Sequence, residues 1–173
     1  MSDALTGIVR LVHIFSAVAW LGGVFLWNMV IGPRVMAKGP PQIRAPFAQA
    51  VVPAMTRFYM IAGILAILSG FVLVGQIGGW GGYFDTFSAG AYGAALGFGA
   101  LMAIAMAVVG FGFTAPAGKK LLELMTSMKG PPTAEQQAEL AARGKKMGIL
   151  GMLAMLFGTL ALAGMVWAVN TVR

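Results

Sequence analysis

Four long, largely apolar runs limit what this chain can fold into. They occupy about residues 8–31, 58–77, 89–115 and 147–169. A helix that rises about 1.5 Å per residue needs ~20 largely apolar residues to cross a hydrocarbon layer of ~30 Å, and each run reaches that length. The sequence therefore predicts four membrane-spanning helices.

Composition agrees with this interpretation. The chain is 59% hydrophobic and 10% charged, with a mean hydropathy of +0.85, whereas a soluble domain carries roughly 25% charged residues. Short connections make consecutive helices antiparallel neighbours. We expect an all-α, integral membrane, up-down-up-down four-helix bundle that forms one domain over residues 1–173 and contacts the lipid bilayer.

The net charge of +7 is unevenly distributed along the chain. Basic residues gather between the first and second runs and between the third and fourth, whereas the connection near residues 78–88 carries only Asp85. By the positive-inside rule, both basic loops lie in the cytoplasm and both termini lie outside the inner (plasma) membrane. Basic loops beside a membrane fit anionic lipid headgroups, and we do not expect nucleic acid as a partner. The basic residues include Arg34, Lys38, Arg44, Lys119, Lys120, Arg143, Lys145 and Lys146.

Prolines and a capping pattern suggest where helices begin and end. Pro53 fits the first turn of the second helix, where a missing N–H costs nothing, and Pro116 is expected to end the third. The segment from Thr133 to Gln136 has the pattern of a helix start, followed by a short amphipathic stretch that leads into the fourth run. Small residues four apart predict close helix contacts at Ala95/Gly99, Ala154/Gly158, Gly93/Gly97 and Gly144/Gly148.

The only histidine of the chain, His13, lies inside the first run. At 100° per residue, Ser16 and Trp20 share its face of the helix, and Arg10 lies one turn outward. An ionisable residue within a membrane span suggests a functional site, because placing it in hydrocarbon costs a few kcal/mol. Three interpretations of His13 remain open.

The first interpretation is an axial ligand of b-type haem. A neutral imidazole binds iron, Trp20 and the two glycines after it would leave a flat apolar slot, and Arg10 would pair with a propionate. The second ligand would then be Met165, which lies near the outer end of the fourth helix at about the depth of His13.

The second interpretation is a copper site formed by His13 with some of the 13 methionines, because soft thioethers suit Cu(I). The methionines are scattered, however, and methionine commonly fills apolar packing. The third interpretation is structural, with His13 hydrogen-bonded to a backbone carbonyl, a headgroup or water.

Several classes of function are disfavoured by what the sequence lacks. It contains no cysteine, which excludes disulfides, thiolate metal sites and covalent c-type haem attachment. No carboxylate lies in a predicted span, which argues against proton-coupled transporters and carboxylate-based hydrolases. The common hydrolase, metalloprotease and nucleotide-binding motifs are also missing.

The stretch RLVHIFSAVAWLGGVFLWNMVIGPRV resembles the first helix of the CopD/HemJ-like four-helix membrane superfamily, which often has the form LHxxxxxxWxGG. PAMTRFYMIAGILAILSGFVLV is similar to the second helix of that group, with a basic residue near its start and SG near its end. In the HemJ branch, linked to protoporphyrinogen oxidation and haem binding, the first-helix histidine is an axial ligand, a role that the resemblance implies for His13. That branch also uses a lysine, and no lysine lies in a predicted span here. The CopD branch, associated with copper uptake, would imply additional histidines and methionines.

The preferred hypothesis is a membrane protein that binds haem b through His13 and transfers electrons as a subunit of a respiratory or redox complex. A cofactor-free structural or accessory subunit, packed against other membrane subunits or in a homo-oligomer, is the main alternative. Copper uptake or handling is a further one. The small size of the chain favours a redox subunit over a self-sufficient enzyme.

Overall fold

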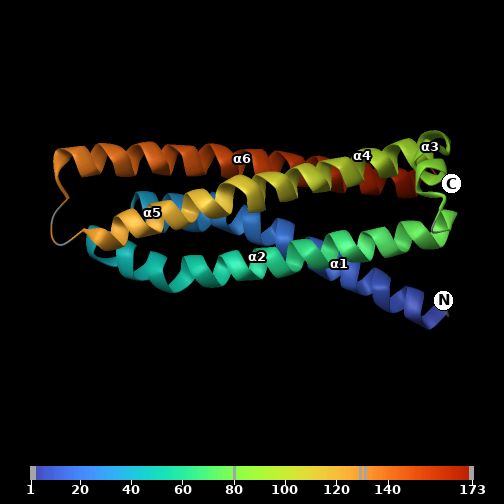
Figure 1. The fold of residues 1–173 in the computed structure, drawn as a ribbon, viewed down its shortest axis with the longest axis horizontal. Helices are drawn as coiled ribbons and strands as arrows, with labels where there is room; N and C mark the ends of the chain where they lie inside the picture. Colours follow the sequence, from blue (N-terminus) through green and yellow to red (C-terminus); the bar gives the residue numbers. More distant parts are fainter. Residues whose placement is uncertain (1–2, 80, 129, 131, 172–173) are drawn as a thin grey trace.

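The structure is a computed structural model that describes residues 3–79, 81–128, 130 and 132–171. Four long, apolar helical rods dominate it (Figure 1), and each is long and apolar enough to cross a membrane, as predicted. The first rod is α1 (Asp3–Leu26) continued by η1 (Trp27–Ala37), and the second is α2 (Pro41–Gly78). After the short α3 (Tyr83–Ser88) come the third rod, α4 (Gly90–Ala107), η2 (Val108–Thr114) and α5 (Ala115–Ser127), and the fourth, α6 (Ala134–Asn170).

The rods extend beyond the apolar runs that predicted them. Their candidate spanning segments contain 35 to 38 residues, and a helix of that length measures roughly 55 Å, against ~30 Å for a hydrocarbon layer. Hydropathy therefore located the apolar part of each helix but not its ends. The sequence interpretation did not include α3, which occupies the connection between the second and third rods.

Both proline predictions were wrong. Pro53 lies well inside α2, because the helix already begins at Pro41 in the more polar stretch before the apolar run. Pro116 does not end the third rod, which continues through α5 to Ser127. An interior proline removes one backbone hydrogen bond and usually kinks or breaks an α-helix, yet α2 continues past both Pro46 and Pro53.

The helix is widened immediately before Pro116. In η2 the backbone hydrogen bonds reach five residues back, and the N–H of Ala115 donates to the carbonyl of Gly110. The hydroxyl of Thr114 likewise donates to the carbonyl of Val109, at 2.9 Å. The first rod has a similar π-helical segment, η1, with Pro33 inside it. Such segments are rare, and they let a rod pass a proline without ending.

The predicted start of the last helix is confirmed. The N–H of Gln136 donates to the hydroxyl of Thr133, and the N–H of Thr133 donates to the side-chain oxygen of Gln136. These two bonds satisfy donors that the first turn would leave unpaired. From Ala134 the helix runs without interruption into the apolar run, so the expected amphipathic stretch belongs to α6 itself.

The rods are arranged chiefly as two neighbouring pairs, α1 with α2 and α4 with α6. Connections between consecutive rods lie alternately at the two ends of the molecule, and the N-terminal part of α1 diverges from the other rods (Figure 1). Only 6% of the apolar window of the first rod is buried, against 28–33% in the others. Taken over its whole length, α1 has α2 as its main neighbour.

A small core connects the two pairs. Trp20 of α1 is 5% exposed, and its ring stacks on Phe111 of η2 with centroids 5.8 Å apart. The core thus lies toward the middle of the rods, where all four contribute to it. Its buried members are Trp20, Ala62, Ala66, Met106, Ala107 and Ala154.

Glycines bring α4 and α6 into backbone contact. A Cβ added at Gly164 would lie 2.8 Å from the Cα of Gly99, and one added at Gly99 would lie 3.0 Å from the carbonyl oxygen of Ala161. In lipid, helices associate through this kind of close packing. The predicted pairs Ala95/Gly99 and Ala154/Gly158 are buried, whereas a Cβ at Gly144 or Gly148 would meet nothing within 4 Å.

We predict opposite effects of alanine at two glycines of α6. Gly164→Ala forces the α4 and α6 backbones apart and should lower the free energy of unfolding by about 1–3 kcal/mol. Gly144→Ala adds its methyl group to open space and should be neutral or slightly stabilising, because alanine favours helix over glycine. Unfolding of the two variants in the same detergent measures the difference, and equal stability would contradict the close α4–α6 contact.

Candidate functional site

His13 lies on the face of α1 that packs against α2. Its Nδ1 is 2.8 Å from the carbonyl oxygen of Ala66, and the side chain is partly exposed. Because a carbonyl only accepts hydrogen bonds, Nδ1 must carry the proton and donate it. The lone pair of the neutral ring then lies on Nε2, the nitrogen available to a metal.

Small residues of α2 form the recess that holds the imidazole. The buried hydroxyl of Ser69 is 3.4 Å from Nδ1 and donates to the carbonyl of Leu65. A Cβ added at Gly70 would lie 3.0 Å from Cε1 of His13 and 3.3 Å from Nδ1. Gly70 therefore admits the ring, and the Ala66 carbonyl sets its tautomer.

Sequence reasoning did not assign Ala66, Ser69 or Gly70 to the site. The resemblance drew attention to the SG pair Ser69-Gly70 near the end of the second helix. Helical periodicity alone, however, does not reveal which side chain of another helix lies opposite this pair. The sequence pattern that could have indicated the recess is that Ala66, Ser69 and Gly70 are all small and share one face of α2.

Trp20 lies on the same stripe, beyond Ser16, and it belongs to the core. A Cβ added at Gly63 of α2 would lie 3.0 Å from the Trp20 ring. Deeper still, the Tyr59 ring occupies the space beside Gly23, and its hydroxyl donates to the Gly23 carbonyl at 2.8 Å. The structure thus gives Trp20 a packing role, and its contact with a cofactor stays a prediction.

Arg10 is exposed on α1, about one turn before His13. This position agrees with the helical spacing that suggested a propionate partner. The pairing itself stays a prediction.

Met165 lies at about the depth of His13 but packs in the other helix pair. Leu21 packs on Gly158 and Asn28 packs on Gly151, which sets the antiparallel register of α1 and α6. Moving seven residues from Leu21 toward the N-terminus of α1, and seven from Gly158 toward the C-terminus of α6, places Met165 level with Ile14, next to His13. The methyl group of Met165, however, lies against α4, 3.3 Å from where a Cβ of Gly99 would be. The described contacts of His13 are with α2 and those of Met165 are with α4, so joint ligation stays a prediction.

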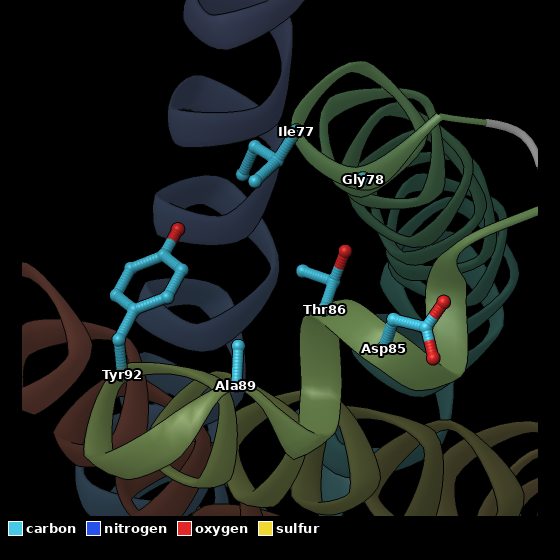
Figure 2. A pocket seen from close by; sticks show the side chains of 6 residues that line it. All are labelled: Ile77, Gly78, Asp85, Thr86, Ala89 and Tyr92. Carbon is cyan, nitrogen blue, oxygen red and sulfur yellow. The ribbon is translucent and has the colours of Figure 1, made fainter.

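Two shallow grooves open on the surface of the rods. One, of about 290 Å³, lies between α1 and α2 beside the buried Ser16, and Phe15, Ala19, Phe58, Ile61, Ala62 and Leu65 complete its lining. The other, of about 270 Å³, lies between α2, α3 and α4 at the end of the rods where α2 connects to α4. Figure 2 shows the Tyr92 ring on one side of it and the Asp85 carboxylate on the opposite side, directed away from Tyr92.

The polar groups of this second groove are few. The Thr86 hydroxyl donates a hydrogen bond to the carbonyl of Gly82, the N-cap residue of α3, at 3.0 Å. This hydroxyl therefore already has a partner within the chain. In the part of the chain that the structure describes, no three His, Asp or Glu side chains gather as a metal site. The imidazole of His13 is thus the strongest candidate for ligand chemistry.

Comparison of the chain with models of protein families, with curated proteins and with solved structures found no match. The resemblance to the CopD/HemJ-like superfamily stays a prediction that rests on residues of the first two helices.

The single histidine makes its tautomer directly measurable. In protein labelled with ¹⁵N-histidine, we expect the neutral form of the imidazole to carry its proton on Nδ1, because Nδ1 donates to the Ala66 carbonyl. Gly70→Ala should shift both resonances by displacing the ring, whereas Gly22→Ala, where a Cβ would meet nothing within 4 Å, should leave them unchanged. A neutral ring whose proton is on Nε2 in the wild-type protein would contradict the assignment.

Proposed function

We propose that this protein binds b-type haem through Nε2 of His13 and transfers electrons as a subunit of a membrane redox complex. The observation that carries the proposal is the hydrogen bond from Nδ1 of His13 to the Ala66 carbonyl. Metal-ligating histidines almost always donate their other ring N–H to a carbonyl, a carboxylate or water, which fixes the tautomer and the ring orientation.

The residues around His13 fit an axial ligand. The α2 recess holds the ring through one nitrogen and leaves the lone pair on the other. Arg10, exposed one turn outward, would neutralise a propionate. Bound haem would supply one-electron chemistry at its iron, with the polarity and hydrogen bonding of the site adjusting its potential.

The second axial ligand has two candidate sources. Met165 would supply a thioether from α6 if its side chain left the contact with Gly99. A second copy of the chain would supply another imidazole, since one chain has a single histidine.

We also propose that the rods cross the inner membrane as an up-down-up-down bundle, with both termini outside. The alternating connections in Figure 1 support this topology. The positive-inside rule supports the orientation, because the basic residues gather at the end of the molecule that holds the α1–α2 and α5–α6 connections.

A cofactor-free accessory subunit is the second candidate. The same hydrogen bond to Ala66 already satisfies one polar nitrogen of His13 within the helix pair. The outer part of α1 also presents large exposed apolar side chains to the membrane, among them Phe15 at 70% and Val18 at 65%. In this function the hydrogen bond of His13 would stabilise the contact between α1 and α2, and larger membrane subunits would pack against α1.

Difference spectra of the purified protein, dithionite-reduced minus oxidised, test these candidates. We expect a b-type α band that is lost in His13→Ala and kept in Thr159→Ala, which removes a polar group from an exposed position of α6. Protein isolated with its native partners and without haem loss that gives no band would overturn the haem proposal. Stoichiometric copper without a Soret band would instead favour copper handling.

A further inference from the structure

We propose that the groove between α1 and α2 binds a membrane quinone, with the hydroxyl of Ser16 donating a hydrogen bond to one of its ring carbonyls. The groove has a volume of about 290 Å³ and is called the Ser16 groove below. His13 is not among the residues that line it, so the proposal does not depend on bound haem.

Ser16 carries a buried hydroxyl without a partner. The residue is 8% exposed, and in the part of the chain that the structure describes its hydroxyl makes no hydrogen bond. Hydroxyls within helices commonly bond the carbonyl four residues back. Thr56 and Thr159 each do so at 2.8 Å, but Ser16 does not. Since an unpaired donor in an apolar interior is unfavourable, this hydroxyl indicates that a bound molecule accepts its hydrogen bond.

The Ser16 groove is otherwise apolar. Among the described residues that line it, Ser16 has the only polar side chain. The small Ala19 and Ala62 contribute little bulk, and Phe15 and Phe58 contribute aromatic rings. Ligand sites commonly have this composition, with apolar and aromatic walls and a few polar groups that orient the ligand. The groove therefore fits an apolar molecule that carries a hydrogen-bond acceptor.

The hydroxyl lies toward one end of the groove. In the antiparallel pair of α1 and α2, Trp20 faces Gly63. Ser16 lies about one turn before Trp20, and is therefore near the Leu65 end of the α2 lining. This lining extends to Phe58, roughly 10 Å further along the helix. The groove thus offers a polar contact at one end and an apolar stretch beyond it, which matches a quinone ring and its prenyl tail.

The depth of Ser16 distinguishes a quinone from a phospholipid. Ser16 lies about 9 Å further into the membrane than Arg10, the only arginine of the first apolar run. The ester and phosphate oxygens of a phospholipid lie in the interfacial layer outside the hydrocarbon, and its acyl chains carry no acceptor. A quinone dissolves in the hydrocarbon and brings its ring carbonyls with it, so it supplies an acceptor at the depth of this hydroxyl.

Titration of the haem-free, full-length protein in detergent with decylubiquinone tests this site. We expect saturable binding and a carbonyl infrared band of the bound quinone at lower frequency, because a hydrogen bond weakens the C=O bond. Ser16→Ala should weaken binding about fivefold and remove the band shift. Decylbenzene, which has the same tail but no carbonyl, should bind the wild type and Ser16→Ala equally. Because haem is absent from this titration, its result is separate from that of the haem proposal.

Control variants separate the Ser16 groove from general effects on the helices. Thr159→Ala removes a hydroxyl of α6 that is already bonded to Met155, and should leave quinone affinity unchanged. Phe15→Ala removes a ring from the lining and should weaken binding about fivefold. Val18→Ala, outside the lining, should have no such effect. Both Phe15 and Val18 are largely exposed, so these two variants are expected to fold.

The thermal stability of the quinone-free protein gives a second readout. Ser16→Ala should leave the unfolding midpoint unchanged or raise it, because the lost hydroxyl has no partner within the described chain. A lowered midpoint would show that the hydroxyl bonds within the fold, and would overturn the proposal.

Three results of the titration would also overturn it. These are equal quinone affinity in the wild type and Ser16→Ala, an unshifted carbonyl band in the wild type, and a phospholipid that native mass spectrometry finds bound to the wild type but lost in Ser16→Ala.

Discussion

In hydrocarbon no water is present to satisfy backbone N–H and C=O groups, so each spanning segment must form its own hydrogen bonds. This constraint explains why the chain forms four long helical rods and why these rods continue past proline residues. Rather than ending at Pro33 and Pro116, the first and third rods contain widened segments, and in η2 the hydrogen bonds reach one residue further back. The helix continues because an interrupted backbone would leave polar groups without partners.

The same solvent removes most of the hydrophobic force between helices, so their association depends on close contact. The structure achieves this contact by placing a glycine opposite a larger side chain on the neighbouring rod. Within the first helix pair, Gly63 faces Trp20, Gly70 faces His13 and Gly23 faces Tyr59. Between the pairs, Gly158 faces Leu21 and Gly151 faces Asn28. Several of the 25 glycines thus allow helices to pack closely, in addition to giving the backbone conformational freedom elsewhere.

This arrangement gives the two nitrogens of His13 different roles. Nδ1 joins α1 to α2 through the Ala66 carbonyl, an interaction that is strong in a medium of low dielectric constant. Nε2 retains the lone pair on which the proposed haem ligation depends. The packing role of this residue is therefore compatible with its proposed role as a ligand, because metal-ligating histidines usually donate a hydrogen bond from their other ring nitrogen.

The sequence by itself determined the number of apolar helices, their approximate places and the start of α6 at Thr133, because hydropathy, span length and capping are local properties. It also identified His13, since an ionisable residue stands out in an apolar run. It misplaced the ends of the second and third helices, because the continuation of a helix past proline depends on its wider hydrogen-bonding context. Only the tertiary structure decided that Gly70 and Ala66 hold the imidazole, that Trp20 lies in the core, and that Met165 packs on α4. These contacts join residues far apart in the chain, and they depend on the rotation and register of whole helices, which local sequence patterns do not specify.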